Sequence, residues 1–335
     1  MQDAQHPYTA LTPDRVMDAL SELGLWPDGR LLALSSYENR VYRVHLDEPV
    51  AGIAPEVRSV VVKFYRPGRW TAQQIQEEHA FAAELVTAEV PVVAPLVLHG
   101  ATLHHRGGFD FAVSPLRGGR APELDDLDVL EWIGRFLARL HNSGAAHPFV
   151  HRPALDVAQF AQEPAEWLLR ERAIPLEVEG EWRAAYEAAL PLLQSALDGL
   201  GEKAIRVHGD CHPGNILWTP DTGPHFVDLD DARMAPAVQD LWMLLSGDRR
   251  QRRLQLSALL DGYEQLRDFD RRELAWIEGL RTLRLIHYSA WLARRWSDPI
   301  FPINFPWFGT PDYWRGQVQM LHEQIEAMQE EPLVA

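Results

Sequence analysis

The sequence is poor in cysteine and in long apolar runs. Its 335 residues contain one cysteine, Cys211, so an intramolecular disulfide is excluded and nothing indicates an oxidising compartment. No uninterrupted apolar run approaches the roughly 18 residues that indicate a membrane-spanning helix. Residues 1–7 carry neither the basic nor the apolar part of a secretory leader. We therefore expect a cytoplasmic protein that does not enter a membrane.

Basic residues are also scarce relative to acidic ones. The chain has 32 Lys+Arg against 48 Asp+Glu, which gives a formal net charge of −16 and repels phosphate backbones and anionic lipids. The densest basic stretch, four arginines within residues 249–253, precedes a helical pattern and is more typical of a solvated helix end than of a nucleic-acid site. We expect no nucleic-acid or membrane partner, and a monomer.

The remaining composition favours a folded protein of two lobes. Hydrophobic residues make up 46% of the chain, and a length of this order corresponds to more than one small core. The first part predicts a mixed lobe. Its expected elements are a helix over residues 12–24, strands at 31–34, 41–46 and 60–65, a helix from residue 71, and strands at 92–98 and 109–113.

A Pro/Gly-containing connection follows at residues 114–120, and most of the later sequence has helical periodicity. We therefore expect an α+β, two-lobed, protein-kinase-like fold. Residues 1–115 would form a small β-rich nucleotide lobe, and residues 116–335 a larger helical lobe.

The most informative stretch is HGDCHPGN at residues 208–215. It contains Asp210 and Asn215, and Asp228 follows at the end of the next apolar run. A loop Asp, an Asn five residues later and a second Asp match metal-assisted phosphoryl transfer, because amide and carboxylate oxygens suit a hard cation such as Mg²⁺. Upstream, Lys63 lies within a β-branched strand and precedes a helix that carries glutamates, as in a kinase.

These residues resemble the catalytic loop of the aminoglycoside/choline/homoserine kinase superfamily, and within it the bacterial stress response kinase A group. The resemblance covers residues 11–331, nearly the whole chain. It implies an ATP-dependent serine/threonine protein kinase linked to envelope and oxidative stress. The other stretches that resemble that group are SSYENRVY at 35–42, VKFYRP with GRW at 62–70, VDLDDAR at 227–233, DLWMLL at 240–245, and FP with NFPW at 301–307.

The resemblance also implies roles for single residues. Asp210 would be the catalytic base. Asn215 and Asp228 would hold Mg²⁺, and Asp228 would thereby take part in catalysis. Lys63 would bind the α- and β-phosphates of ATP, since a lysine on a strand presents a point charge. Its orienting partner on the helix would be Glu78, with the neighbouring residue 77 as the alternative.

Three further residues would contact the nucleotide. Ser36 lies in the turn between the first two strands, where its hydroxyl could meet a phosphate oxygen. Ser114 and Leu116 would form the hinge whose backbone groups bind adenine.

The sequence departs from ordinary protein kinases in ways that leave the acceptor open. No G-x-G-x-x-G lies between the first two strands, and Gly209 precedes the catalytic Asp where protein kinases have Arg. Small-molecule kinases share these departures. The acceptor is therefore a protein Ser/Thr hydroxyl, autophosphorylation included, or a small alcohol of the aminoglycoside, choline or homoserine type. Asp230 and Asp231 would suit a cationic acceptor or a basic peptide, although solvated loop carboxylates are commoner.

The same loop invites two other interpretations. His208 and His212 with Cys211 have zinc-ligand spacing, but Gly209 and the Pro-Gly at 213–214 break any helix there, so a structural His208 is preferred. Cys211 is more often a small packed residue than a redox sensor. We expect Asp240 to accept backbone N–H groups of the catalytic loop rather than to bind metal, because the residues after it predict a buried helix.

Overall fold

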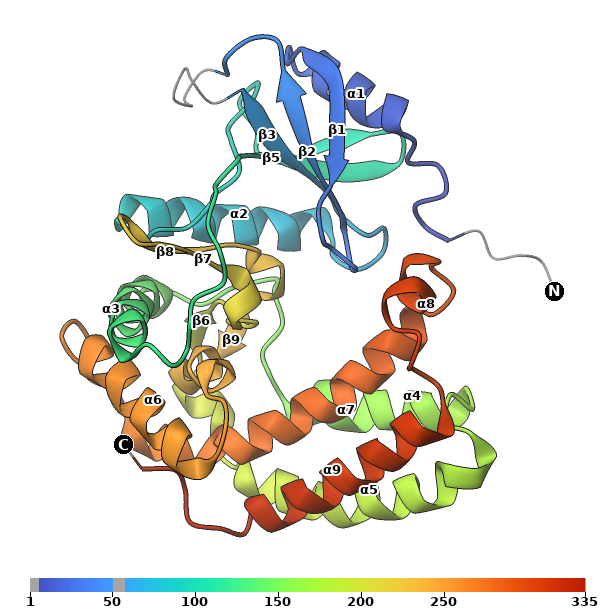
Figure 1. Ribbon diagram of the computed structural model, residues 1–335, viewed down its shortest axis with the longest axis vertical. Coiled ribbons are helices and arrows are strands. Elements are labelled where there is room, and N and C mark those ends of the chain that lie inside the picture. The colour runs from blue at the N-terminus through green and yellow to red at the C-terminus, as the bar shows by residue number, and fades with distance from the viewer. Residues whose placement is uncertain (1–5, 51–57, 335) are drawn as a thin grey trace. The chain divides into compact units, whose positions relative to one another are not determined.

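The computed structural model describes residues 6–50 and 58–334. The chain divides into two compact units (Figure 1). The first contains the chain up to residue 122 together with residues 150–152 and 213–232, and the second contains the rest. Most of the N-terminal residues on which the leader expectation rests, residues 1–5, lie outside the described residues. The predicted lobes, 1–115 and 116–335, stay a prediction.

A five-stranded antiparallel sheet forms the core of the first unit, in the order β1-β2-β3-β5-β4. Alternation along β3 buries Val60, Val62 and Phe64 and leaves Lys63 on the opposite face. Helix α1, predicted over residues 12–24, packs its buried stripe on this core, and the Thr12 side chain caps its first turn. The elements are α1 (Pro13–Glu22), β1 (Pro27–Ala33), β2 (Arg40–Leu46), β3 (Ser59–Phe64), α2 (Ala72–Thr87), β4 (His104–Arg106) and β5 (Phe109–Pro115).

The prediction of a strand at residues 92–98 is wrong. Pro91 and Pro95 lack backbone N–H groups, so this stretch cannot form a continuous ladder. It makes only isolated bridges, among them Val92 with Phe226. The fourth strand of the sheet is instead β4, which pairs with β5 through the tight turn at residues 107–108.

The first unit is completed by a hairpin and a short turn from later in the chain. The hairpin consists of β7 (Ile216–Thr219) and β8 (Gly223–Phe226), and its register pairs Ile216 with Phe226. The turn η4 (Leu229–Asp231) follows directly and contacts α2. Figure 1 shows the hairpin beside α2, within the same unit. The register therefore sets Asn215 beside the chain that leads into Asp228.

The second unit is helical, as predicted. Its α3 and α6 approach closely because a glycine faces a backbone carbonyl: a Cβ at Gly134 would lie 2.0 Å from the Leu259 oxygen. Figure 1 shows α5 and α9 side by side. The helices are α3 (Leu127–Gly144), α4 (Glu163–Arg170), α5 (Leu176–Ala196), α6 (Arg249–Tyr263), α7 (Ile277–Arg295), α8 (Ile300–Asn304) and α9 (Pro311–Ala327), with a π-helical turn η1 (Ala158–Gln162) before α4 and a two-stranded ladder of β6 (Ile205–Val207) and β9 (Arg233–Ala235).

The arginine cluster agrees with expectation. It is the exposed start of α6, where Arg249 pairs with Glu330, so it is a solvated helix end. The aromatic segment 301–314 is a packed connector in which Phe301 and Trp314 are buried. Among the described residues, no helix is both long enough and apolar enough to cross a membrane.

Candidate active site

The candidate site residues fall into two sets, one in each unit. In the first unit, Lys63 Nζ lies 2.7 Å from Asp228 Oδ1 and 3.2 Å from Asp230 Oδ1. Burial alone would lower the Lys63 pKa, but the charges of Asp228 and Asp230 outweigh it and raise that pKa well above its usual value. The strand lysine is therefore held as a cation beside the residue predicted to bind metal.

The predicted metal residues are brought together by the hairpin. Val227 N donates to Asn215 O at 3.0 Å, which places Asn215 next to the residue preceding Asp228. Asp228 itself adopts a left-handed backbone conformation, with φ 60° and ψ 62°, and its side chain is half exposed. The Asn215 amide oxygen and the Asp228 carboxylate flank the two ends of the β7–β8 hairpin. They fit Mg²⁺, because this ion keeps several waters and takes phosphate oxygens as its other ligands. The structure thus supplies a donor set of the right chemistry.

The interpretation of Asp230 as a solvated loop carboxylate is wrong. Asp230 is 2% exposed; it pairs with Lys63 and Arg69 and accepts a hydrogen bond from Asn39 Nδ2 at 3.2 Å. Burial would raise its pKa, but Lys63 and Arg69 hold the pKa of Asp230 below its ordinary value. Asp231 accepts two hydrogen bonds from Arg69 Nη2, at 2.9 and 3.0 Å. Both carboxylates are thus engaged with internal cations.

Glu77 and Glu78 have different partners in this structure. Glu77 accepts backbone N–H groups of residues 150–152, so it is not directed to Lys63. Glu78 is buried, and its Oε2 lies 3.8 Å from Arg152 Nη1. Burial raises the pKa of Glu78 to about 7, while the charges of Lys63 and Arg152 act against this rise. Lys63 is near enough to act on Glu78 electrostatically. The role of Glu78 as the residue that orients Lys63 stays a prediction.

The predicted nucleotide contacts lie at the ends of sheet strands. Ser36 Oγ donates to Asn39 O at 3.1 Å and so closes the turn between β1 and β2. To bind a phosphate, the Ser36 hydroxyl would have to donate its hydrogen bond to a phosphate oxygen instead of to Asn39 O. Ser114 is the last but one residue of β5, opposite Val61, and Leu116 is the first residue after that strand. The nucleotide roles of these three residues remain predictions.

In the second unit, Asp240 organises the catalytic loop, and the prediction that it accepts backbone N–H groups is confirmed. Its Oδ2 accepts from His208 N at 2.7 Å and its Oδ1 from Gly209 N at 2.8 Å, and Oδ2 also meets His141 Nε2 at 3.0 Å. Asp240, His141 and His208 are all fully buried. Gly209 adopts φ +85°, a conformation that favours glycine, so the loop needs glycine where protein kinases have arginine.

Asp210 lies at the end of this scaffold between two basic side chains. Arg284 Nη1 donates to its Oδ1 at 2.5 Å, and His212 Nε2 lies 3.5 Å from its Oδ2. Burial would raise the Asp210 pKa, but the hydrogen bond with His212 and the charge of Arg284 hold that pKa well below its usual range. Asp210 is therefore an ionised carboxylate, able to orient a hydroxyl and to accept its proton.

Cys211 is buried at 0% exposure, as expected of a packed residue. Burial, together with the charges of Asp240 and Asp210, raises the pKa of its thiol well above the usual value. Within residues 6–50 and 58–334, no group of three or more His, Cys, Asp or Glu side chains is arranged to hold a metal.

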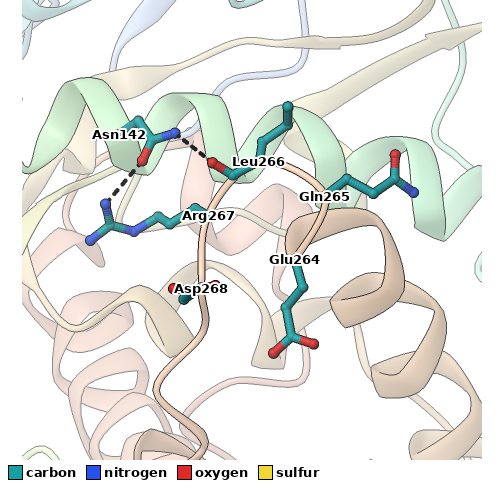
Figure 2. A pocket seen from close by; sticks show the side chains of 6 residues that line it. All are labelled: Asn142, Glu264, Gln265, Leu266, Arg267 and Asp268. Carbon is teal, nitrogen blue, oxygen red and sulfur yellow. Dashed lines mark hydrogen bonds between the residues drawn. The ribbon is translucent and has the colours of Figure 1, made fainter.

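A depression on the second unit contains none of the candidate residues (Figure 2). Three of its polar groups bond to one another, since Asn142 Nδ2 donates to Leu266 O at 3.1 Å and Arg267 Nη1 donates to Asn142 Oδ1 at 3.0 Å. It is therefore a helix connection rather than a ligand site. Its lining residues are Asn142, Glu264, Gln265, Leu266, Arg267 and Asp268.

Sequence reasoning missed three arginines. Arg284 lies 74 residues after Asp210 and Arg152 lies 78 residues before Asp230, so no local pattern links these pairs. Arg69 belongs to a stretch that carried the family resemblance, but nothing in that stretch identified the carboxylates it binds.

Comparisons with known proteins show the family to which the chain belongs. Residues 30–277 match the phosphotransferase enzyme family. The chain is 46% identical over 336 residues to "Stress response kinase A" of Escherichia coli (strain K12) and to "Serine/threonine protein kinase RdoA" of Salmonella typhimurium (strain LT2), covering 99% of this chain and 98% of each relative.

Solved structures show the same fold at low sequence identity. An amicoumacin kinase, solved with AMP-PNP, Ca²⁺ and Ami, has a TM-score of 0.70 at 17% identity, covering 96% of this chain and 95% of that one. A microcompartment-associated aminopropanol kinase has a TM-score of 0.67 at 18% identity, covering 93% and 98%. The chain therefore belongs to the phosphotransferase enzyme family, with a kinase fold of the aminoglycoside phosphotransferase type, and within that family to the stress response kinase A group.

Proposed function

We propose that this chain is a cytoplasmic, monomeric serine/threonine protein kinase of the bacterial stress response, which uses ATP with Mg²⁺ and which can also phosphorylate itself. The observation that carries the proposal is the ion pair of Lys63 with Asp228, 165 residues apart in the sequence. It joins a phosphate-binding cation to the metal-binding carboxylate, as nucleotide-dependent phosphoryl transfer requires. The names of the relatives support the acceptor class.

Each residue has a defined task in this proposal. Lys63 neutralises phosphate charge, and Asn215 and Asp228 hold Mg²⁺, which when bound neutralises the phosphate oxygens of the nucleotide. Asp210 orients the acceptor hydroxyl and accepts its proton as the new O–P bond forms and the bond to the β–γ bridging oxygen breaks. ADP leaves with the electron pair of that broken bond. Catalysis is thus by positioning and charge neutralisation.

The engagement of Asp230 and Asp231 bears on the acceptor. These carboxylates were the sequence feature that suited a cationic small alcohol or, equally, a basic peptide. Both are bound to internal cations, Asp230 to Lys63 and Arg69 and Asp231 to Arg69, so neither offers an open anionic site. They therefore do not distinguish the two acceptor classes, and the protein acceptor is proposed on the names of the relatives.

Replacing the proposed base tests the assignment. Asp210→Ala should lower the phosphorylation rate by about 10²- to 10⁴-fold, the range for a lost general base, and leave ATP affinity within about threefold of wild type because the nucleotide residues are untouched. Transfer from [γ-³²P]ATP to a generic protein substrate measures the rate. Asp312→Ala removes an exposed carboxylate that pairs only locally with Arg315, and serves as the control. A near-normal rate in Asp210→Ala would refute the role.

The acceptor class and the metal role need separate measurements. Wild-type protein is assayed with mixed protein substrates and with a panel containing an aminoglycoside, choline and homoserine. Phosphate on a small alcohol alone would overturn the protein-kinase proposal and favour the other branch of the superfamily. Asn215→Ala and Asp228→Ala should raise the Mg²⁺ concentration needed for half-maximal rate. Unchanged magnesium titrations would contradict the metal assignment.

A further inference from the structure

A three-residue segment from the helical part of the sequence belongs to the first unit. The Glu77 carboxylate accepts the backbone N–H groups of Val150, His151 and Arg152, at 2.6, 2.8 and 2.9 Å. Gln74 Nε2 adds a donor to the His151 carbonyl at 3.0 Å. Burial would raise the Glu77 pKa, but these three N–H groups hold it below its usual value. The segment is therefore fixed to α2 by an ionised carboxylate.

The Arg152 side chain continues from this anchor to the metal-binding turn. Its Nε donates to Ala232 O at 2.5 Å, and its Nη2 donates to Asp230 O. Its Nη1 donates to Gln74 O at 3.0 Å, and the guanidinium lies 4.5 Å from the centre of the Trp70 ring. The side chain is fully buried. One planar group thus joins three carbonyls of two separate elements.

The turn that Arg152 holds begins at a residue with a costly backbone conformation. Asp228 is left-handed, a conformation that costs a non-glycine residue about 1–2 kcal/mol. The backbone hydrogen bond that closes η4 runs from Ala232 N to Leu229 O at 2.9 Å. Arg152 reaches the carbonyls at both Asp230 and Ala232, so it spans the turn that Asp228 begins. A lysine has no planar fork of donors and cannot reproduce this geometry.

Arg152 also faces Glu78 of α2. Its Nη1 lies 3.8 Å from Glu78 Oε2, and its charge favours the ionised form of a carboxyl group that burial disfavours. The same guanidinium therefore contacts the backbone of the Asp228 turn and the predicted partner of Lys63.

We propose that Arg152 is a positioning residue for metal binding at the nucleotide site: it fixes the turn that carries Asp228 against α2, although it lies far from both in the sequence. The proposal rests on the proposed function only in taking Asp228 as a metal ligand. It assigns a role to a segment that the sequence places outside the nucleotide lobe.

The test compares Arg152→Lys with a matched substitution. Arg281 in the second unit makes the same kinds of contact: it faces the Trp242 ring, donates to Leu245 O and pairs with Glu278. Arg281→Lys thus controls for a general loss of stability. Two measurements on the full chain are needed, namely hydrogen exchange of residues 228–232 and the affinity for a fluorescent ATP analogue with and without Mg²⁺.

For Arg152→Lys we expect exchange in the turn to accelerate at least tenfold. We also expect affinity for the analogue to fall about tenfold with Mg²⁺ and less than twofold without it. Arg281→Lys should change neither. Unchanged exchange in the turn, or an affinity loss that is equal with and without Mg²⁺, would overturn the proposal. If wild-type protein binds the analogue without any effect of Mg²⁺, the proposed function fails, and exchange alone then decides whether Arg152 holds the turn.

Discussion

Replacing Asp240 tests how the catalytic loop is built. Asp240→Ala leaves two buried backbone donors, His208 N and Gly209 N, without their acceptor and removes the contact with His141. A buried donor left unsatisfied costs about 1–3 kcal/mol, so the two N–H groups together predict a loss of about 4 kcal/mol. That is a large part of the roughly 5–15 kcal/mol that stabilises a typical domain. Asp240→Asn should cost less, because its amide oxygen can still accept one N–H group.

Urea unfolding followed by tryptophan fluorescence measures the effect, since the chain has 12 tryptophans. Asp248→Ala is the matched control. Asp248 also accepts a backbone N–H group, that of Gln251 at 2.8 Å, but does so as an exposed helix cap, so its loss should cost only about 1 kcal/mol. Equal losses for the two variants would refute the reasoning. A raised magnesium requirement at unchanged stability would instead make Asp240 a metal ligand.

The other predictions concern packing, burial and charge. Gly134→Ala should destabilise the second unit by about 1–3 kcal/mol, because its Cβ would meet the Leu259 carbonyl and force α3 and α6 apart; an unchanged melting temperature would contradict this. Burial raises the pKa of Glu273 to about 7, so this group holds its proton in the folded state and favours unfolding as the pH rises from about 4.5 to 7. Glu273→Gln should therefore stabilise the protein at pH 8 by up to about 3 kcal/mol and have no effect near pH 4, as pH-dependent urea titrations will show. Arg284→Gln should raise the pKa of Asp210 toward its ordinary value of about 4. A carboxyl NMR titration that shows no rise would contradict the conclusion that Arg284 lowers this pKa.

The sequence predicted those parts of the site that lie within one local pattern. The loop with Asp210 and Asn215 and the strand with Lys63 follow from spacing and periodicity. Asp240 could be assigned because apolar residues follow it at once, which indicates a buried carboxylate needing donors. The strands expected at 41–46, 60–65 and 109–113 were recovered within about two residues. The first strand begins at Pro27 rather than at residue 31, β4 was missed, and the strand expected at 92–98 is absent from the sheet because Pro91 and Pro95 interrupt the ladder there.

The remainder depended on contacts that only tertiary structure defines. Arg284 reaches Asp210 from α7. The periodicity of this helix indicates a partly exposed face, but it does not identify the carboxylate that Arg284 binds. Arg152 is buried because a carboxylate on α2 binds the backbone of its own segment, and composition carries no signal for this. Asp230 looked like a solvated loop residue because its cations, Lys63 and Arg69, lie more than 160 residues away. Long-range pairing of charges was thus the missing information.

The burial of Cys211 bears on the resistance of the catalytic loop to oxidation. Oxidants attack the thiolate rather than the thiol, and this sulfur is both covered and held protonated by its surroundings. The loop therefore carries its one oxidisable sulfur in an unreactive form, next to the residue proposed to accept the substrate proton. Packing alone thus protects the protein from oxidative inactivation at this position, without a reductase to repair it.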